Sequence, residues 1–104
     1  MSTAPGSLVR NSANRFTAVF VINGLQSTFS ATMNPSVQPF SSNNVTLTYN
    51  KASDLTGTRS YNGRIGPDDL ALTLDNGVQI TGTLNQPGID PAASVDGSGV
   101  WEQN

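Results

Sequence analysis

The chain holds three side chains suited to ligand binding in one short segment, LTGTRSYNG at 55–63, and its only tryptophan near the end. An arginine can hold a ligand through forked hydrogen bonds, and an asparagine can hydrogen-bond hydroxyl groups. Tyrosine and tryptophan can cover the C–H face of a sugar, and Trp, Tyr and Arg often anchor binding sites. We therefore expect a ligand-binding site made of Trp101, Tyr61, Arg59 and Asn62. Two other interpretations stay open: Trp101 fills the core, and Arg59 extends to water.

The remaining reactive groups do not favour catalysis. The chain has no histidine and no cysteine, so Ser-His-Asp triads, Cys-His pairs and imidazole metal sites are excluded. The seven acids lie mostly in predicted turns, where aspartate caps its own backbone, so they do not indicate a glycosidase pair. Residues 96–99, DGSG, resemble part of a calcium loop but lack its further acids. We expect a protein that is not an enzyme, with no cofactor and no metal site.

The composition indicates a folded domain with a neutral, polar surface. Only 12% of the residues are charged and the net charge is −2, while Asn, Ser and Thr number 11, 12 and 11. A chain this low in net charge and with runs such as FTAVFVI is expected to fold. The five basic residues are scattered rather than clustered, which argues against nucleic-acid binding. They are Arg10, Arg15, Lys51, Arg59 and Arg64.

No segment of the sequence predicts a membrane or targeting function. The longest wholly apolar run, Ala18 to Ile22, is far too short to cross a bilayer. The N-terminus lacks the charged-then-apolar pattern of a signal peptide. We expect a soluble protein without membrane insertion, either cytoplasmic or a mature secreted chain.

An internal repeat predicts the architecture. The segments 23–42 and 76–94 share an Asn-Gly pair, a Gln and a Thr at the same spacing, and a Pro-x-x-x-Pro connector. A repeat of about half the chain predicts one domain, residues 1–104, built from two similar units with pseudo-twofold symmetry. The units are expected at 8–50 and 55–104, after a flexible lead-in at 1–7.

Strand signals dominate both units, because β-branched and aromatic residues occur in short runs between Asn, Gly, Pro and Asp. The Pro-x-x-x-Pro connectors, 35–39 and 87–91, should be loops, since proline cannot donate to a ladder. We expect an all-β fold of about eight short strands, either a small antiparallel β-barrel or a two-sheet sandwich. The expected strands are 8–11, 15–22, 25–33, 44–50, 55–62, 69–74, 78–84 and 98–103.

The apolar alternation also predicts the register of the hairpins. A three-residue loop ending in Gly77, with that glycine in the left-handed region, places Leu74 opposite Val78. The same register in the first unit pairs Val21 with Leu25. It leaves strand 15–22 apolar on both faces, which need cover on both sides.

Phe16 and Phe20 would then lie on the face that needs cover. Cover by a second chain would make these two residues a subunit interface and the protein a homodimer. Cover by a loop or by the N-terminal segment is the alternative.

The segments LTGTRSYNG and LALTLDNGVQITGTL are similar to the opening strands of avidin-family barrels, in which a TGT strand leads to a second strand and then to a Gly-x-x-Thr-Gly-Thr strand. This resemblance covers about thirty residues and implies barrel geometry. The family's tryptophan after the first TGT is replaced here by Arg59, so biotin binding is not implied.

The neutral surface, the duplication and the lack of catalytic groups favour a carbohydrate-binding protein, a lectin that recognises neutral sugar hydroxyls on a glycan or glycoprotein. One alternative is a protein-interaction module, such as a protease inhibitor or a structural subunit. Another is a barrel that holds a small apolar ligand near Arg59 and Trp101.

Overall fold

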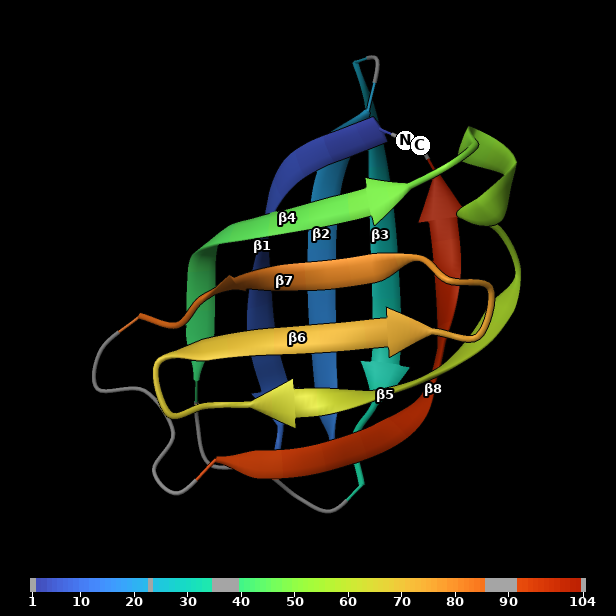
Figure 1. The fold of residues 1–104 in the computed structure, drawn as a ribbon. Coiled ribbons are helices and arrows are strands. Elements are labelled where there is room, and N and C mark those ends of the chain that lie inside the picture. The colour runs from blue at the N-terminus through green and yellow to red at the C-terminus, as the bar shows by residue number, and fades with distance from the viewer. Residues whose placement is uncertain (1, 23, 35–39, 86–91, 104) are drawn as a thin grey trace.

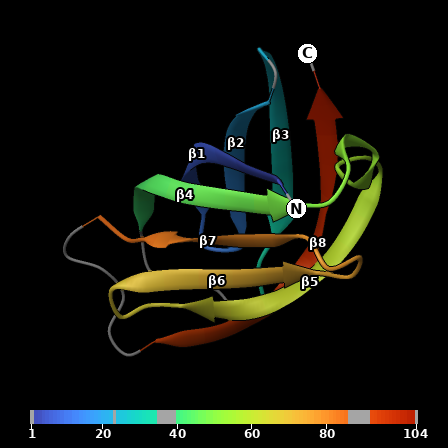
Figure 2. The ribbon, with the colours of Figure 1, turned by 45° about the horizontal axis from the view of Figure 1, so that its top comes forward.

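The structure, a computed structural model, describes residues 2–22, 24–34, 40–85 and 92–103. In this part of the chain, eight antiparallel strands close into a barrel, which confirms the all-β and barrel expectations (Figure 1, Figure 2). In Figure 1, β4, β7 and β6 cross in front of β2 and β3. The elements are β1 Ser2–Ser12, β2 Arg15–Ile22, β3 Leu25–Thr32, β4 Ser41–Tyr49, the 3-10 helix η1 Ala52–Asp54, β5 Thr58–Ile65, β6 Asp69–Leu74, β7 Gln79–Thr83 and β8 Ala93–Gln103.

The strand order around the barrel is β1-β2-β3-β8-β5-β6-β7-β4, and β4 pairs again with β1. Each half of the chain therefore has the spatial order 4-1-2-3 of a Greek key, as β4-β1-β2-β3 and β8-β5-β6-β7. The two halves join where β3 pairs with β8 and where β7 pairs with β4. This order differs from an up-and-down barrel, in which strands pair in chain order.

The first strand begins earlier than the sequence indicates. Residues 2–7, expected as part of a flexible lead-in, form the first half of β1, with Ser2 opposite Tyr49. Ala4 is buried in the core. The pairing of β1 with β2 begins only at Gly6, so the preceding Pro5 pairs with β4 alone. A proline is tolerated at such an edge because its missing N–H is not needed there.

Alternation along each strand fills the barrel with apolar side chains, as in other small barrels. The aromatic part of this core is one connected cluster, in which the ring of Phe29 lies 4.8 Å from that of Trp101 and 6.2 Å from that of Phe16. Leucine and isoleucine side chains of the second half complete the core: Leu55, Ile65, Leu70, Leu72, Leu74, Ile80 and Leu84.

The β6–β7 turn has the predicted geometry. The N–H of Leu74 donates to the carbonyl of Val78 at 2.8 Å, and Thr73 lies opposite Gln79. Gly77 has a φ of +89°, in the region that only glycine enters without strain. The three-residue loop and its register are therefore confirmed.

The predicted β2–β3 register is wrong. Ile22, not Val21, lies opposite Leu25, because this turn is one residue shorter than its counterpart. A shift of one residue moves every side chain of a strand to the other face. Phe16 and Phe20 consequently point into the barrel, where 1% and 0% of their surface is exposed within a single chain. The expectation that these two residues form a subunit interface is corrected accordingly, since their own barrel covers them.

Candidate functional site

Two of the four predicted site residues are core residues. Trp101 is 4% exposed, and its ring packs against Phe29 and Phe20 at centroid distances of 4.8 and 6.3 Å. Tyr61 is equally buried and meets Phe16 edge-on at 5.6 Å. Neither ring offers a face to a ligand, so the interpretation of Trp101 as a core residue matches its position.

The hydroxyl of Tyr61 is held inside the barrel as a neutral donor. It donates a hydrogen bond of 2.6 Å to the backbone carbonyl of Thr32. Burial raises the pKa of this hydroxyl well above its ordinary value, and the negative charge of Asp96 raises it further. Its role is therefore to hydrogen-bond the carbonyl of Thr32, not to exchange protons near neutral pH.

The other two predicted residues point in opposite directions. Asn62 is exposed on the outer face of β5. Arg59 is on the same face of the strand as the buried Tyr61 and Ile65, at the end of the barrel. The guanidinium of Arg59 approaches the carboxylate of Asp75 to 3.6 Å, and its Nε is buried without a partner among the described residues. The structure thus does not bring the four predicted residues together.

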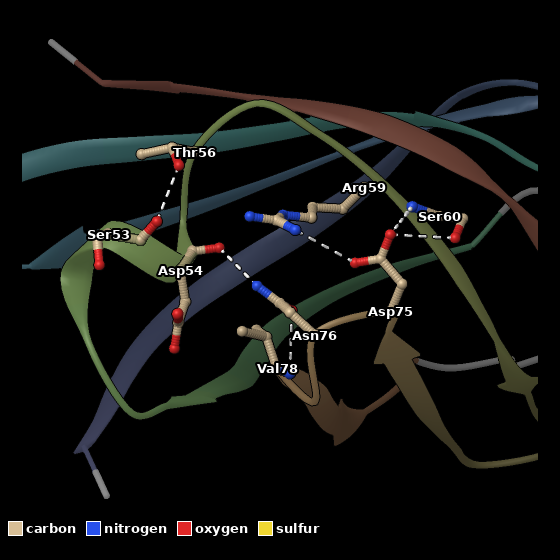
Figure 3. A network of polar contacts seen from close by, with 8 residues as sticks. All are labelled: Ser53, Asp54, Thr56, Arg59, Ser60, Asp75, Asn76 and Val78. Atoms are coloured by element: carbon tan, nitrogen blue, oxygen red, sulfur yellow. Dashed lines mark hydrogen bonds and ion pairs between the residues drawn. The ribbon is translucent and has the colours of Figure 1, made fainter.

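The segment between β4 and β5 covers this end of the barrel, which we call the barrel mouth. Leu55, just after η1, inserts its side chain into the core and is 1% exposed. Hydrogen bonds hold the backbone on either side. The side-chain amide of Asn76 donates to the carbonyl of Asp54 at 2.9 Å (Figure 3). The N–H of Trp101 donates to the carbonyl of Gly57 at 3.0 Å. In Figure 3, Arg59 and Asp75 lie beside this covering segment.

A shallow hollow of about 100 Å³ lies on the rim of the mouth, and we call it the Tyr49 cleft. Its lining residues come from the end of β4, from η1 and from the β6–β7 turn with the start of β7. Tyr49 follows Val45 and Leu47 at the inward parity of β4, but it lies at the end of the strand and is only partly buried. The cleft is lined by Thr48, Tyr49, Asn50, Asp54, Asn76, Gly77, Val78 and Gln79.

The polar groups of the Tyr49 cleft fall into two sets. Asn76 is used by the fold, because its Nδ2 donates to Asp54 and its Oδ1 accepts the N–H of Val78 at 3.3 Å. One carboxylate oxygen of Asp54 accepts the N–H of Lys51 at 3.2 Å. The side chains of the second set have no hydrogen-bond partner among the described residues, which leaves them available to a ligand. They are Thr48, Tyr49, Asn50 and Gln79.

Tyr49 is distinguished from every other aromatic residue of the chain. The four Phe, two Tyr and one Trp all lie in the described residues, and the other six are buried. The sequence analysis missed this residue, although one signal was present. Tyr49 continues the alternation of Val45 and Leu47 and directly precedes Asn50. An aromatic residue at such a strand end lies between the core and solvent.

The described residues show no sign of a metal centre or of a membrane-spanning helix. Among the described residues, no group of three or more acids is placed to hold a metal ion. No helix in this part of the chain has the length and apolarity to span a membrane. The exposed Val9 and Val100 face outward but are separated by Thr17 and Ser30 across the sheet, so they form no continuous patch.

Comparison of the chain with protein-family models, with curated protein sequences and with solved structures finds no match. The geometry of the described residues therefore carries the functional argument.

Proposed function

We propose that the protein is a non-catalytic carbohydrate-binding protein whose sugar site is the Tyr49 cleft. The observation that carries this proposal is the position of Tyr49, the one aromatic ring that is partly exposed, among amide and hydroxyl groups that have no partner in the described residues. The proposal keeps the lectin expectation and moves its site away from Trp101.

The chemistry of the cleft suits a neutral sugar. A tyrosine ring has an apolar face that can cover the C–H side of a pyranose, while its hydroxyl stays in contact with water. The amides of Asn50 and Gln79 each supply donors and an acceptor, which match hydroxyl groups that both donate and accept. At about 100 Å³ the cleft is too small to enclose a large ligand, so it would contact one face or edge of a single ring.

The single acid at the cleft favours binding rather than hydrolysis. Asp54 is the only carboxylate among the described residues that line it, and one of its oxygens accepts the N–H of Lys51. Glycoside hydrolysis ordinarily needs two carboxyl groups that flank the scissile bond. A single acid supports recognition of a sugar hydroxyl instead.

The strand order also supports the pseudo-twofold relation between residues 8–50 and 55–104. The Greek-key order is the same in both halves, and Gly24 and Gly77 have positive φ angles in equivalent turns. The Pro-x-x-x-Pro connectors, 35–39 and 87–91, lie outside the described residues. The internal symmetry and the homodimer stay predictions, and a dimer would have to use a face other than Phe16 and Phe20.

The proposal is tested with a glycan array followed by calorimetric titration of the best neutral glycan. We expect Tyr49→Ala to weaken binding about tenfold or more, the scale of a central aromatic contact. Gln79→Ala should also weaken it, and this exposed residue can be changed without disturbing the core. Thr46→Ala is the matched control, because Thr46 is exposed on the same strand outside the cleft.

The fluorescence of the buried Trp101 reports whether each variant is folded. A silent array, or an affinity that is the same in wild type, Tyr49→Ala and Gln79→Ala, would overturn the proposal. Size-exclusion chromatography of the same preparation measures the oligomeric state.

A further inference from the structure

A second hollow lies at the barrel mouth, next to the Tyr49 cleft but lined by different residues. Its volume is about 310 Å³, at the lower end of the range for small-molecule pockets. It opens between the β2–β3 hairpin, the segment after η1 and the end of β8. We call it the mouth cavity, and its lining residues are Ile22, Leu25, Ser27, Ser53, Leu55, Thr56 and Gln103.

The walls of the mouth cavity are mainly apolar. Leu25 lies opposite Ile22 at the start of β3, at the parity of strand positions that face the barrel interior. It is nevertheless 56% exposed, whereas Ile22 and Leu55 are buried. The exposed side chain of Leu25 gives the hollow an apolar wall, and covering this wall with an apolar ligand would remove it from water.

Of the three hydroxyl side chains that line the cavity, those of Ser27, Ser53 and Thr56, only that of Ser27 belongs to a buried residue. Ser27 is 3% exposed. A ligand that fills the cavity would exclude water from this hydroxyl, so the ligand has to offer the hydrogen bond that water can otherwise make there. One N–H of the Gln103 side-chain amide donates to the carbonyl of Leu55, which ties this side chain to the covering segment.

The lining also defines the charge of the occupant. Among the described residues, no acidic or basic side chain lines the cavity, so a charged ligand would find no counter-ion on these walls. A sugar would bury several hydroxyl groups against Ile22, Leu25 and Leu55 without partners, so it fits this cavity poorly.

We propose that the mouth cavity binds a neutral, compact apolar molecule that carries a single hydroxyl or carbonyl group. Its apolar body packs against Ile22, Leu25 and Leu55, and its oxygen exchanges a hydrogen bond with the hydroxyl of Ser27. This site is separate from the Tyr49 cleft, so it does not depend on the proposed sugar binding.

The probe is benzyl alcohol, with toluene as the analogue that has the same ring and no hydroxyl. In an NMR titration of the full chain up to about 10 mM, a range that captures millimolar dissociation constants, we expect saturable shifts of amides around Ser27, Leu55 and Gln103. Benzyl alcohol should bind more tightly than toluene, since only the alcohol satisfies Ser27.

Two variants separate the contributions. Leu25→Gln should weaken both ligands about fivefold or more, by loss of an apolar wall. Its matched control is Val21→Gln, which changes an equally exposed residue (57%) of the same hairpin that does not line the cavity. Ser27→Ala should abolish the preference for benzyl alcohol over toluene while leaving the binding of toluene intact.

Absence of saturable shifts, shifts that map away from the mouth cavity, or equal binding by wild type and Leu25→Gln would each overturn the proposal. Glycan binding by the same samples is measured separately, so failure here is distinguished from failure of the Tyr49 cleft.

Discussion

The substitution Tyr61→Phe should make the protein less stable at neutral pH and relatively more stable at high pH. Phenylalanine keeps the ring that packs against Phe16 and removes only the hydroxyl that donates to the carbonyl of Thr32. The loss of this partly buried hydrogen bond should lower the free energy of unfolding by about 1 kcal/mol between pH 7 and pH 9.

Above pH 10 the effect changes sign because the pKa of Tyr61 is raised by folding. In the unfolded chain the hydroxyl ionises at its ordinary pKa of about 10, whereas the folded chain keeps the proton. The stability contributed by Tyr61 is complete below that pH and is lost as the pH rises, by about 1.4 kcal/mol at pH 11. The variant has no such loss, so its unfolding free energy should equal or exceed that of the wild type near pH 11.

Urea unfolding followed by Trp101 fluorescence at intervals from pH 8 to pH 11 measures this crossing. Tyr49→Phe is the control, because Tyr49 is the only other tyrosine and lies at the rim of the barrel. Other groups titrate equally in wild type and Tyr61→Phe, so their effects cancel in the difference. A gap that stays constant across this range would refute the account of Tyr61 as a hydroxyl held neutral by burial.

Two further substitutions test the core and the β6–β7 turn. Trp101→Ala should lower the free energy of unfolding by about 3–5 kcal/mol, because it leaves a cavity beside Phe29. Urea unfolding measures this loss, and a loss below about 1 kcal/mol would contradict the core position of the ring. Gly77→Val should lower the free energy of unfolding by about 1 kcal/mol or more, since a β-branched residue is strained at a φ of +89°. The strain comes from the backbone alone, because a Cβ added at this position would have no atom within 4 Å. Gly77→Asn, which tolerates this region better, should lose less, and equal melting temperatures for wild type and Gly77→Val would contradict the register.

The hairpins show what alternation in the sequence can and cannot predict. In the β6–β7 hairpin, all three leucines of β6 lie on the same face of the strand, so the sequence pattern aligns Leu74 with Val78 without ambiguity. In β2, RFTAVFVI has apolar residues on both faces of the strand, so alternation alone does not show which face points into the barrel. The structure turns Phe16 and Phe20 inward and leaves Val21 outside, which buries the larger aromatic surface.

The site residues depended on neighbours that are distant in the chain. Arg59 lies at the barrel mouth, and its contact with Asp75 requires the β6–β7 turn to fold back beside β5. Tyr49 becomes part of a cleft only because β4 pairs with β7, which places Gln79 opposite Thr48. Nothing within either segment encodes that pairing, because it arises from closure of the barrel.

The way in which the barrel closes also determines how the chain reaches its folded state. The pairs β3–β8 and β7–β4 join the two Greek keys, and residues such as Phe29 and Trp101 meet across most of the length of the chain. Such contacts require the closure of long loops, so folding should take milliseconds to seconds, as in other barrels with many non-local contacts. Until these pairs form, β3, β4, β7 and β8 present unpaired edges. When β3 of one chain meets β8 of another, the same pairing forms between molecules, so refolding at high concentration competes with domain-swapped assembly.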